Sequence, residues 1–417
     1  MTKIKSLLMA SALALPLPAQ AQDNGSIEVL HHWVSESEVA ALNVIREKLA
    51  DEGFGWEDSA VGGMSGANAT QALRTRLASG NPPGAMQFLG YEGLNWNAEG
   101  VVRDFSDLAN ENGWFDALPA EVAQFVTHDG QFFATPINMH RQNWVWANKK
   151  VFDDNGLTVP GTWAELIAMG PKLKDAGIVP LATGDEAWQI QLIFDALVSD
   201  LNGPDFYRRA VVDLDPEALK SDEMIAVFDT LRAVRGLVDD GFVGRDWAVA
   251  TDMVATGAAA MQVHGDWAKG EFLAAGLKEG EDFLCFATPS ATPSFQFIID
   301  SFGAFETSDA ATSAAQEILA KATMDPEVQR AFNQIKGSIP ARTDVSVEGF
   351  DSCAVKGAKD RAAAIENGAM LGALTHGFAS QPQFAAVFGD VVGQFFVTDM
   401  SSQNAVDMLA NGVANAM

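Results

Sequence analysis

The sequence predicts an α/β protein with more than one core. Apolar stretches of strand length run directly into segments with helix start signals, which is typical of strand-helix units. The chain has 417 residues, enough for two or more separate cores. At residues 134–150 (ATPINMHRQNWVWANKK), Pro136 separates two apolar runs and marks a change of element. We expect the chain to pass from one lobe to another there.

The first 21 residues are typical of a secretory signal peptide. Lys3 and Lys5 precede an apolar run at residues 7–17, and an Ala-Gln-Ala sequence ends at Ala21. The run is too short to span a bilayer, and no later run approaches the ~18 residues that a span requires. We therefore expect cleavage after Ala21 and export to the periplasm, with a buried N-terminal helix as the alternative.

Charge and cysteine content exclude several classes of protein. Acidic residues outnumber basic ones by 55 to 27, and this net charge of −28 argues against nucleic acids and anionic membranes as partners. Cys285 and Cys353 are the only cysteines, too few for a disulfide framework or a cysteine metal site. They either pair, which needs Cα atoms within about 7 Å, or remain separate thiols. The sequence leaves both possibilities open.

The first strand is expected at residues 26–33, where alternate side chains point to opposite faces. Ser35 and Glu38 then have the spacing of a capping box, and apolar residues follow at helical spacing. A second unit has glycines before a helix that ends at residues 80–83, followed by a short buried strand at residues 85–89. Such units place a binding site at the carboxyl ends of their strands.

Helices are expected to dominate the next part of the chain. Thr162 and Glu165 have the spacing of another capping box. Further strands are predicted at three apolar runs, residues 259–264, 283–287 and 295–299. Prolines lie between the last two runs, where we expect a second crossing between lobes. A third crossing is expected at residues 336–342.

Aromatic and polar residues occur together where several predicted strands end. They are Trp33, Trp188, Trp247 and Trp267, with Glu38, Asp266, Asp300 and His376. Sugars present C–H faces that pack on aromatic rings, and hydroxyls that bind carboxylates, amides and imidazoles. The combination favours a carbohydrate cleft, although each tryptophan is also a candidate core residue.

The polar candidates have structural alternatives. In the alternative interpretation, Glu38 does no more than pair with the Ser35 cap, and His376 is an ordinary loop histidine. Asp300 interrupts an apolar run, and a carboxylate there needs partners or a ligand. The sequence has no H-E-x-x-H or G-x-S-x-G motif and no His/Cys cluster. We expect a binding protein with no cofactor and no metal, and not an enzyme.

Several segments resemble the periplasmic solute-binding proteins of ABC sugar importers, in particular the glucose-type proteins. The segments follow the family's order over nearly the whole chain: LHHWVSESE (30–38), GGMSGANATQALRTR (62–76), PINMHRQNWVW (136–146), VPGTWAEL (159–166), GAAAMQVHGDW (257–267), DSFG (300–303), KGSIPAR (336–342) and HG (376–377). The resemblance implies a periplasmic-binding-protein-like α/β fold, with two lobes joined by a multi-strand hinge around a ligand cleft. It implies an N-terminal lobe at residues 22–136 and 290–336, and a C-terminal lobe at residues 137–289 and 337–417.

The resemblance also implies which residues bind the ligand: Trp33, Glu38, Gln87, Trp188, Trp247, Trp267, Asp300 and His376. Five further residues are expected to support the hinge or the cleft: His32, Leu89, Asn138, His140 and Arg141. Two positions depart from the family pattern. Relatives often have Trp-Trp where this chain has His32-Trp33, and tend to have Lys or His in place of Leu89. A sugar hydroxyl left unpaired by the loss of such a donor costs about 1–3 kcal/mol.

The sequence therefore predicts a periplasmic protein that binds a monosaccharide, glucose or a related hexose, by hinge closure. It is expected to be a monomer that delivers the sugar to the membrane subunits of an ABC permease. One alternative is a different small carbohydrate or polyol, which the apolar Leu89 would suit. A more distant alternative is a secreted carbohydrate-active enzyme, which requires a carboxyl of raised pKa about 5–10 Å from a second one.

Overall fold

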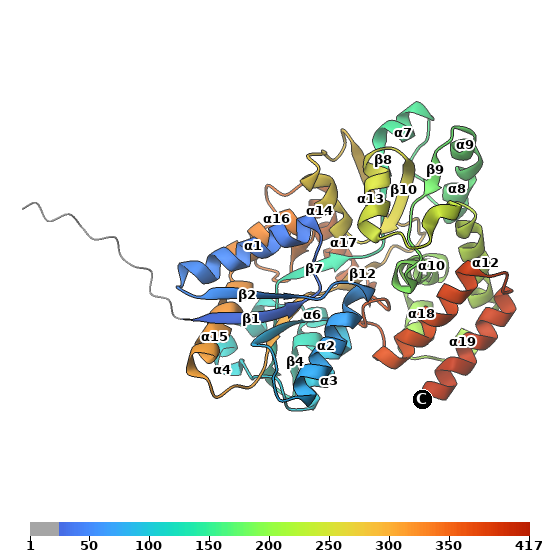
Figure 1. Ribbon diagram of the computed structural model, residues 1–417. Helices are drawn as coiled ribbons and strands as arrows, with labels where there is room; N and C mark the ends of the chain where they lie inside the picture. The colour runs from blue at the N-terminus through green and yellow to red at the C-terminus, as the bar shows by residue number, and fades with distance from the viewer. Residues whose placement is uncertain (1–24) are drawn as a thin grey trace, which may run out of the picture.

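The computed structural model describes residues 25–417, which form two α/β lobes (Figure 1). The predicted signal peptide and its cleavage site after Ala21 lie outside the described residues. In Figure 1, blue N-terminal elements and orange helices form the lobe at the left, and the green, yellow and red elements form most of the other. The α/β fold with two lobes is confirmed, whereas the exact residue ranges of the lobes stay a prediction.

The first lobe contains a five-stranded sheet in the order β2-β1-β3-β13-β6. Strand β1 is parallel to β2 and β3, whereas β13 is antiparallel to β3 and β6. The strands are β1 (Ser26–His31), β2 (Gly55–Ala60), β3 (Ala85–Phe88), β6 (Ala134–Pro136) and β13 (Ser301–Ala304), with a separate hairpin of β4 (Thr127–His128) and β5 (Gln131–Phe132). The helices are α1 (Glu36–Asp51), α2 (Ala67–Ala78), α3 (Gly90–Ala98), α4 (Ser106–Glu111), α5 (Trp114–Ala117), α6 (Ala120–Val126), α15 (Ala310–Met324) and α16 (Pro326–Lys336), with a 3-10 turn at Met64–Gly66.

The first strand and first helix follow the local sequence pattern closely. The predicted strand ends two residues early, at His31, and the predicted capping box forms. The Ser35 hydroxyl accepts the Glu38 N–H, while the Glu38 carboxylate accepts the Ser35 N–H at 3.1 Å. The box orients Glu38 at the start of α1, beside the carboxyl end of β1.

The second lobe contains a four-stranded sheet in the order β11-β8-β10-β9. Its strands are β8 (Trp144–Asn148), β9 (Val179–Leu181), β10 (Ala259–His264) and β11 (Phe283–Ala287). Its helices are α7 (Lys149–Asp154), α8 (Trp163–Ala168), α9 (Gly170–Asp175), α10 (Ala187–Tyr207), α11 (Pro216–Leu219), α12 (Asp222–Arg235), α13 (Trp247–Ala255), α14 (Trp267–Ala274), α18 (Pro382–Val397) and α19 (Ser402–Ala416). Short turns of other helix types lie at Arg208–Val212 and Asp240–Phe242. Helices dominate this lobe, as predicted.

The second predicted capping box is only half formed. The Thr162 hydroxyl accepts the Glu165 N–H at 3.2 Å and caps α8. However, the Glu165 carboxylate accepts the N–H of Gly161 at 2.7 Å instead of that of Thr162. The prediction was wrong in this detail because the preceding glycine presents its N–H to the same carboxylate.

A third sheet, in the order β14-β7-β12-β15, connects the lobes. Its strands are β7 (Asn138–Arg141), β12 (Phe295–Ile298), β14 (Ile339–Pro340) and β15 (Met370–Gly372), and α17 (Ser352–Glu366) packs against it. The predicted crossover at residues 134–150 contributes β6, β7 and β8 to three different sheets in succession. Strands β11, β12 and β13 make the same passage in reverse, and β14 joins β7 at the third predicted crossing.

The two cysteines form a disulfide. Their Cα atoms lie 6.1 Å apart, and the bond joins Cys285 in β11 to Cys353 in α17. The alternative of two separate thiols is therefore wrong. The disulfide connects the second lobe to the helix that covers the third sheet. Within residues 25–417, no helix combines the length and apolar character that membrane crossing requires.

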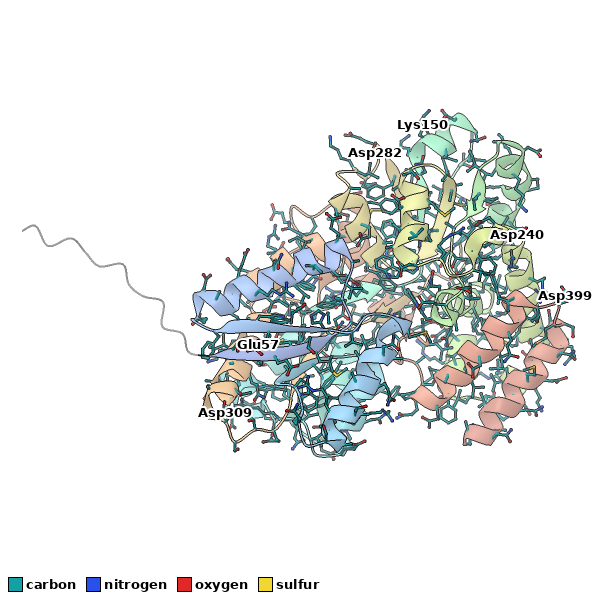
Figure 2. The ribbon with its side chains drawn as sticks, in the orientation of Figure 1. Glu57, Lys150, Asp240, Asp282, Asp309 and Asp399 are labelled. Atoms are coloured by element: carbon teal, nitrogen blue, oxygen red, sulfur yellow. A yellow bond between two sulfur atoms is a disulfide. The ribbon has the colours of Figure 1, made fainter. Side chains whose placement is uncertain are left out.

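Most acidic residues lie on the outer surface. Figure 2 shows Asp282, Asp309 and Asp399 at the edges of the molecule in this view. Among residues 25–417, the buried carboxylates are those of Glu38, Asp195, Asp200, Asp266 and Asp300. Because burying a carboxylate requires partners that replace water, these few residues mark specialised sites.

Candidate ligand-binding site

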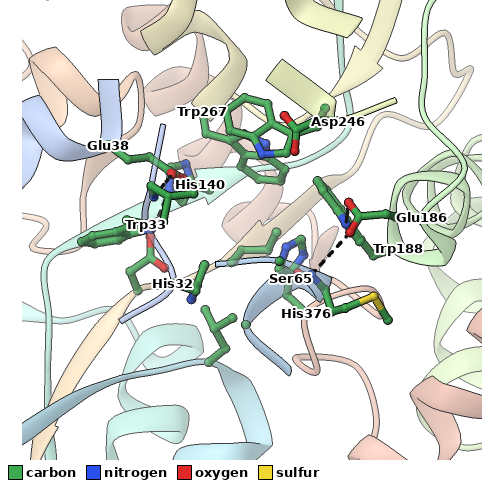
Figure 3. Close-up of a pocket in the computed structure, with 18 of the residues that line it drawn as sticks. His32, Trp33, Glu38, Ser65, His140, Glu186, Trp188, Asp246, Trp267 and His376 are labelled. Carbon is green, nitrogen blue, oxygen red and sulfur yellow. Dashed lines mark hydrogen bonds and ion pairs between the residues drawn. The ribbon is translucent and has the colours of Figure 1, made fainter. Parts of the chain in front are cut away.

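A cavity of about 90 Å³ lies between the lobes, and Figure 3 shows the side chains around it. It is called here the first cavity. The predicted binding residues that line it are Trp33, Glu38, Trp188, Trp247, Trp267, Asp300 and His376. Three of the predicted supporting residues also line it: His32, Leu89 and His140. The structure thus brings together side chains from α1, β7, α10, α13, α14 and the connecting segments.

Asp300 lies at the junction of the third sheet and the first lobe, between β12 and β13. One carboxylate oxygen accepts Gln87 Nε2 at 2.8 Å, and the other accepts Asn138 Nδ2 at 2.7 Å. Gln87 is itself buried and does not line the first cavity, so it reaches the site through Asp300. The sequence placed Gln87 on the ligand, whereas the structure places it behind Asp300.

His140 is clamped between two carboxylates. Its Nε2 lies 3.1 Å from Asp300, and its Nδ1 contacts Asp266. Burial lowers the pKa of His140, but the Asp266 and Asp300 carboxylates outweigh it, and the pKa is raised above its ordinary value. Burial raises the pKa of Asp300. The hydrogen bond and the charge of His140 outweigh this effect and hold the pKa of Asp300 well below its usual range. The cavity floor therefore carries an ionised carboxylate beside a histidine whose charged form is favoured by its two carboxylate partners.

Arg141 follows on the same strand but points away from the first cavity. Its guanidinium donates to Asn143 at 2.9 Å and to the Ser294 carbonyl at 3.0 Å, and contacts Asp360 at 2.5 Å. The group also lies 4.8 Å from the Trp144 ring centroid. Arg141 and Asn138 thus brace the back of the cavity without lining it.

Glu38 forms a second charged group at the cavity wall. Lys336 Nζ lies 3.3 Å from its Oε1, and the N–H groups of Val34 and Ser35 donate to its Oε2 at 3.0 and 3.1 Å. Burial raises the pKa of Glu38, but Lys336 and these hydrogen bonds outweigh it and lower the pKa overall. Glu38 is thus both a helix cap and a residue at the cavity, so its two sequence interpretations are compatible.

Trp267 forms the aromatic centre of the site. Its ring lies edge-to-face with those of His140, His264 and His376, at centroid distances of 5.3, 5.0 and 5.5 Å. A Cβ at Gly265 would lie 2.0 Å from the Trp267 ring, so the glycine is needed for this close approach. Burial lowers the pKa of both His264 and His376 to about 3. These two imidazoles are therefore neutral at neutral pH.

The other three tryptophans at the first cavity differ in how much of each ring faces it. Trp247 stacks on His264 at 5.5 Å, and Trp188 lies 5.9 Å from His376. Trp33 is only 2% exposed, and its ring packs on Phe302 at 5.9 Å and on another core ring. Trp33 therefore belongs to the core of the first lobe while one edge reaches the cavity.

Sequence reasoning missed four polar residues that line the first cavity: Ser65, Glu186, Asp246 and Lys336. Lys336 begins the KGSIPAR segment, and Glu186 lies two residues before Trp188, so both were next to recognised signals. Glu186 accepts the Trp188 indole N–H at 2.9 Å and fixes that ring. Asp246 caps α13 by accepting the Ala248 N–H at 2.8 Å.

The arrangement suits the binding of a small uncharged molecule with many hydroxyls. Aromatic faces, neutral imidazoles and ionised carboxylates surround one small cavity. Neither Asp300 nor Glu38 has the raised pKa that a general acid for glycoside hydrolysis requires. Among the described residues, Glu279 with Cys285 and Cys353 has the spacing of a metal site, but the two sulfurs are bonded to each other and are not thiolates.

Comparison with known proteins agrees with this geometry. Residues 56–322 match the family described as bacterial extracellular solute-binding protein. A relative from Rhizobium meliloti is 42% identical over 415 residues, covering 100% of this chain and 98% of its own, and is named "Probable sugar-binding periplasmic protein". A relative from Brucella suis with the same name is 42% identical over 398 residues, covering 95% of this chain and 94% of its own.

Solved structures share the fold at low sequence identity. The bacterial solute receptor AcbH superimposes with a TM-score of 0.79 at 19% identity, covering 94% of this chain and 99% of its own. RafE in complex with raffinose gives a TM-score of 0.73 at 19% identity, with the same coverage. The family match spans most of the chain, and the alignment with the Rhizobium relative covers 100% of this chain at 42% identity, so the family is established. The chain belongs to the bacterial extracellular solute-binding protein family.

Proposed function

We propose that this protein is the periplasmic sugar-binding component of an ABC importer. The first cavity holds one hexose ring, glucose or a related monosaccharide, and the two lobes close around it. The loaded protein then delivers the intact sugar to the membrane permease. It acts as a monomer in the periplasm, after cleavage behind Ala21, and performs no covalent chemistry.

The observation that carries the proposal is the contact of Trp267 with the Asp300–His140 pair. The Trp267 ring lies 5.3 Å from the His140 ring, and His140 in turn bonds Asp300. A pyranose has both an apolar face for such a ring and hydroxyls that donate to an ionised carboxylate.

Each residue then has a definite role. Trp267 packs against the sugar ring, while Trp188, Trp247 and the edge of Trp33 bound the cavity. Asp300 and Glu38 accept hydroxyl hydrogen bonds, and neutral His376 donates or accepts one. Gln87 acts indirectly, because its amide holds Asp300 in place.

The relatives support the chemical class of the ligand. Four relatives at 42% identity have names that describe periplasmic sugar binding. Among the structures of the same fold, AcbH is described as having an exclusive preference for β-D-galactopyranose, which is a single hexose ring.

Isothermal titration calorimetry with glucose, galactose, mannose and mannitol tests the proposal. One hexose should bind saturably, and Trp267→Ala and Asp300→Asn should each weaken it at least tenfold. Lys150→Ala, which changes an exposed side chain on α7, is the control and should leave the affinity unchanged. Chromatography of the recovered sugar should show the intact compound. Binding of none of these compounds, or the release of a product, contradicts the proposal.

A second candidate is a polyol or another small carbohydrate. The observation that favours it is Leu89, an apolar side chain at the cavity wall. An apolar contact there suits a ligand without a hydroxyl at that corner. In the same titration, binding of mannitol with no response to any hexose would support this candidate over the first.

A further inference from the structure

Asp195 is a fully buried carboxyl that does not line the first cavity. It lies within α10, the helix that has Trp188 in its first turn, and it is 0% exposed. A carboxyl taken out of water needs hydrogen bonds that replace its lost hydration. The partners of Asp195 therefore show which parts of the fold depend on it.

The Asp195 carboxyl joins two separate segments to α10. Its Oδ2 accepts the Leu374 N–H at 2.9 Å and also contacts Nε2 of Gln142. Gln142 lies between β7 and β8, where the chain passes from the third sheet into the second lobe, and Leu374 follows β15 of the third sheet. One carboxyl oxygen thus fixes both segments against the same helix.

Gln296 of β12 extends this network. Its Oε1 accepts Gln142 Nε2 at 3.0 Å, and its Nε2 donates to the Asp195 carbonyl at 2.7 Å and to Ser199 Oγ at 3.1 Å. The side chains of Gln142, Asp195, Ser199 and Gln296 are all 0% exposed. Since α10 is bonded to two separate parts of the third sheet, its orientation relative to that sheet depends on these contacts.

The segment that Asp195 holds carries a residue of the first cavity. His376 follows Leu374 by two residues, and its ring lies 5.5 Å from that of Trp267. The Gly377 N–H donates to the Leu374 carbonyl at 3.1 Å, so residues 374–377 form a tight turn. Because Asp195 anchors the first residue of this turn, a displacement of Leu374 also displaces His376 at the cavity wall.

Two oxygens of the Asp195–Gln142 pair are buried without a hydrogen-bond partner among residues 25–417: Asp195 Oδ1 and Gln142 Oε1. The Gln142 amide cannot be reversed, because its nitrogen donates to acceptors on both Asp195 and Gln296. If Asp195 is ionised, the two unpartnered oxygens are both acceptors and neither can satisfy the other. A protonated carboxyl supplies an O–H donor. Because Oδ2 already accepts N–H groups, the proton belongs on Oδ1.

The surroundings of Asp195 favour the protonated form. Burial raises the pKa of Asp195 to about 7, although its hydrogen bonds oppose this effect. Tyr207 and Asp200, both on α10, are ionisable neighbours whose pKa values burial also raises, so neither adds a positive charge. The ionisable groups on β7, β10 and the turn after β15 are either paired with carboxylates or neutral: His140, Arg141, His264 and His376.

We propose that Asp195 is a positioning residue for the ligand site and that it acts as a neutral acid, with a proton on Oδ1 that is donated to Gln142 Oε1. In this form it holds the turn that carries His376 and the segment at Gln142 in one arrangement. Ionisation removes the donor and leaves a charge inside the protein, so both segments loosen. This inference rests on the proposed function of the first cavity.

Asp195→Asn tests the neutral acid, because the amide oxygen accepts the same N–H groups and the amide nitrogen donates where the acid does. Calorimetry uses whichever of glucose, galactose and mannose binds the wild type most tightly. At pH 6, Asp195→Asn should bind this sugar within about twofold of the wild type. Asp195→Leu, which has neither donor nor acceptor, should bind it at least tenfold more weakly.

The pH dependence separates positioning by the acid from a merely structural role. Between pH 6 and pH 9, the wild type should lose at least threefold more affinity than Asp195→Asn does, because only the wild type ionises at this position. Groups such as His140 titrate in both proteins, so the comparison isolates Asp195. This comparison also decides the matter if Asp195→Leu fails to fold.

Asp200→Asn is the matched control. It makes the same substitution five residues further along α10, at a carboxyl that bonds Trp163 and not the Gln142 segment. It should keep the pH dependence of the wild type. Infrared spectroscopy at pH 6 measures protonation without a ligand. The wild type should show a protonated-carboxyl C=O stretching band that Asp195→Asn lacks.

The inference is overturned, while the proposed function stands, by any of three results. These are an Asp195→Asn variant that binds as weakly as Asp195→Leu, an equal loss of affinity at pH 9 in the wild type and Asp195→Asn, or infrared spectra in which no carboxyl band is lost. If the wild type binds none of the sugars, the proposed function fails and the positioning role fails with it.

Discussion

Ser37 donates its hydroxyl to Glu271 at 2.6 Å and so joins α1 of the first lobe to α14 of the second. The two residues are 234 positions apart in the chain. Gly270 makes the approach possible, because a Cβ there would lie 2.7 Å from the Ser37 oxygen. This hydrogen bond joins the two lobes close to the segment that leads into β14, because a Cβ at Gly270 would also lie 3.2 Å from the Ile335 carbonyl.

Ser37→Ala should weaken sugar binding without removing any ligand contact. Loss of the bond lowers the population of the closed form, and the apparent affinity falls in proportion to that population. We expect a two- to tenfold increase in Kd, which corresponds to about 0.4–1.4 kcal/mol. Calorimetry measures the affinity, and small-angle scattering measures the opening. An unchanged Kd together with an unchanged scattering profile would show that this contact does not control closure.

The contacts of His140 with Asp266 and Asp300 predict a loss of stability at alkaline pH. The pKa of His140 is raised in the folded protein above its ordinary value of 6.5, so folding favours the charged imidazolium. The contribution of charged His140 to the free energy of unfolding is complete below about pH 6.5. It is lost as the pH rises through the pKa that His140 has in the folded protein. The difference in unfolding free energy between wild type and His140→Gln should therefore decrease as pH increases from 6 to 9. A difference that stays constant over this range contradicts a charged His140.

Asp200 also predicts a loss of stability as the pH rises, in this case from a buried carboxyl group. Burial raises its pKa to about 7, despite hydrogen bonds that include Trp163 Nε1 at 3.0 Å and the opposing charge of Arg141. Folding thus favours the neutral acid, and the stability is lost as the pH rises from about 4 through 7. Asp200→Asn should raise the melting temperature relative to wild type at pH 8 and have little effect at pH 4. Equal effects at both pH values would show that Asp200 is ionised throughout.

The disulfide predicts a measurable loss of stability on reduction. Cys285 and Cys353 are 68 residues apart, and closing a loop of that length removes chain entropy from the unfolded state. The loop-entropy model gives a stabilisation of about 4 kcal/mol. Urea denaturation of the wild type with and without dithiothreitol, and of Cys285→Ser with Cys353→Ser, should show midpoints that fall together. A midpoint that does not respond to reduction would mean that the bond is absent in solution.

Local patterns in the sequence were sufficient for several strands, including those at residues 26–31, 259–264 and 283–287, and for the first capping box and the three crossings. Strands β2, β9 and β15 were missed. Ser35 and Glu38 are three residues apart, and their reciprocal bonds follow from backbone geometry alone. Strand β10 was predicted with both its ends. The alternation and helix-start signals act over a few residues, so a single sequence contains the information they need.

The composition of the site depended on contacts between distant parts of the chain. His140 meets Asp266 across 126 residues, and Gln87 meets Asp300 across 213. No local pattern determines that Gln87 approaches Asp300 from behind, or that Trp33 turns most of its ring into the core. The left-handed turn at Met64 and Ser65 was missed for a different reason, because residues other than glycine rarely adopt this conformation and the surrounding fold enforces it.

The order of strands in the first sheet has a consequence for synthesis of the protein. Strand β13 lies between β3 and β6 although it follows them by more than 160 residues. A ribosome that has completed only the first half of the chain has therefore produced two strands with unpaired edges and no central partner. Lys336 and His376 arrive later still. The binding site therefore stays incomplete until most of the chain has emerged from the ribosome, and the polypeptide remains incompletely folded until then.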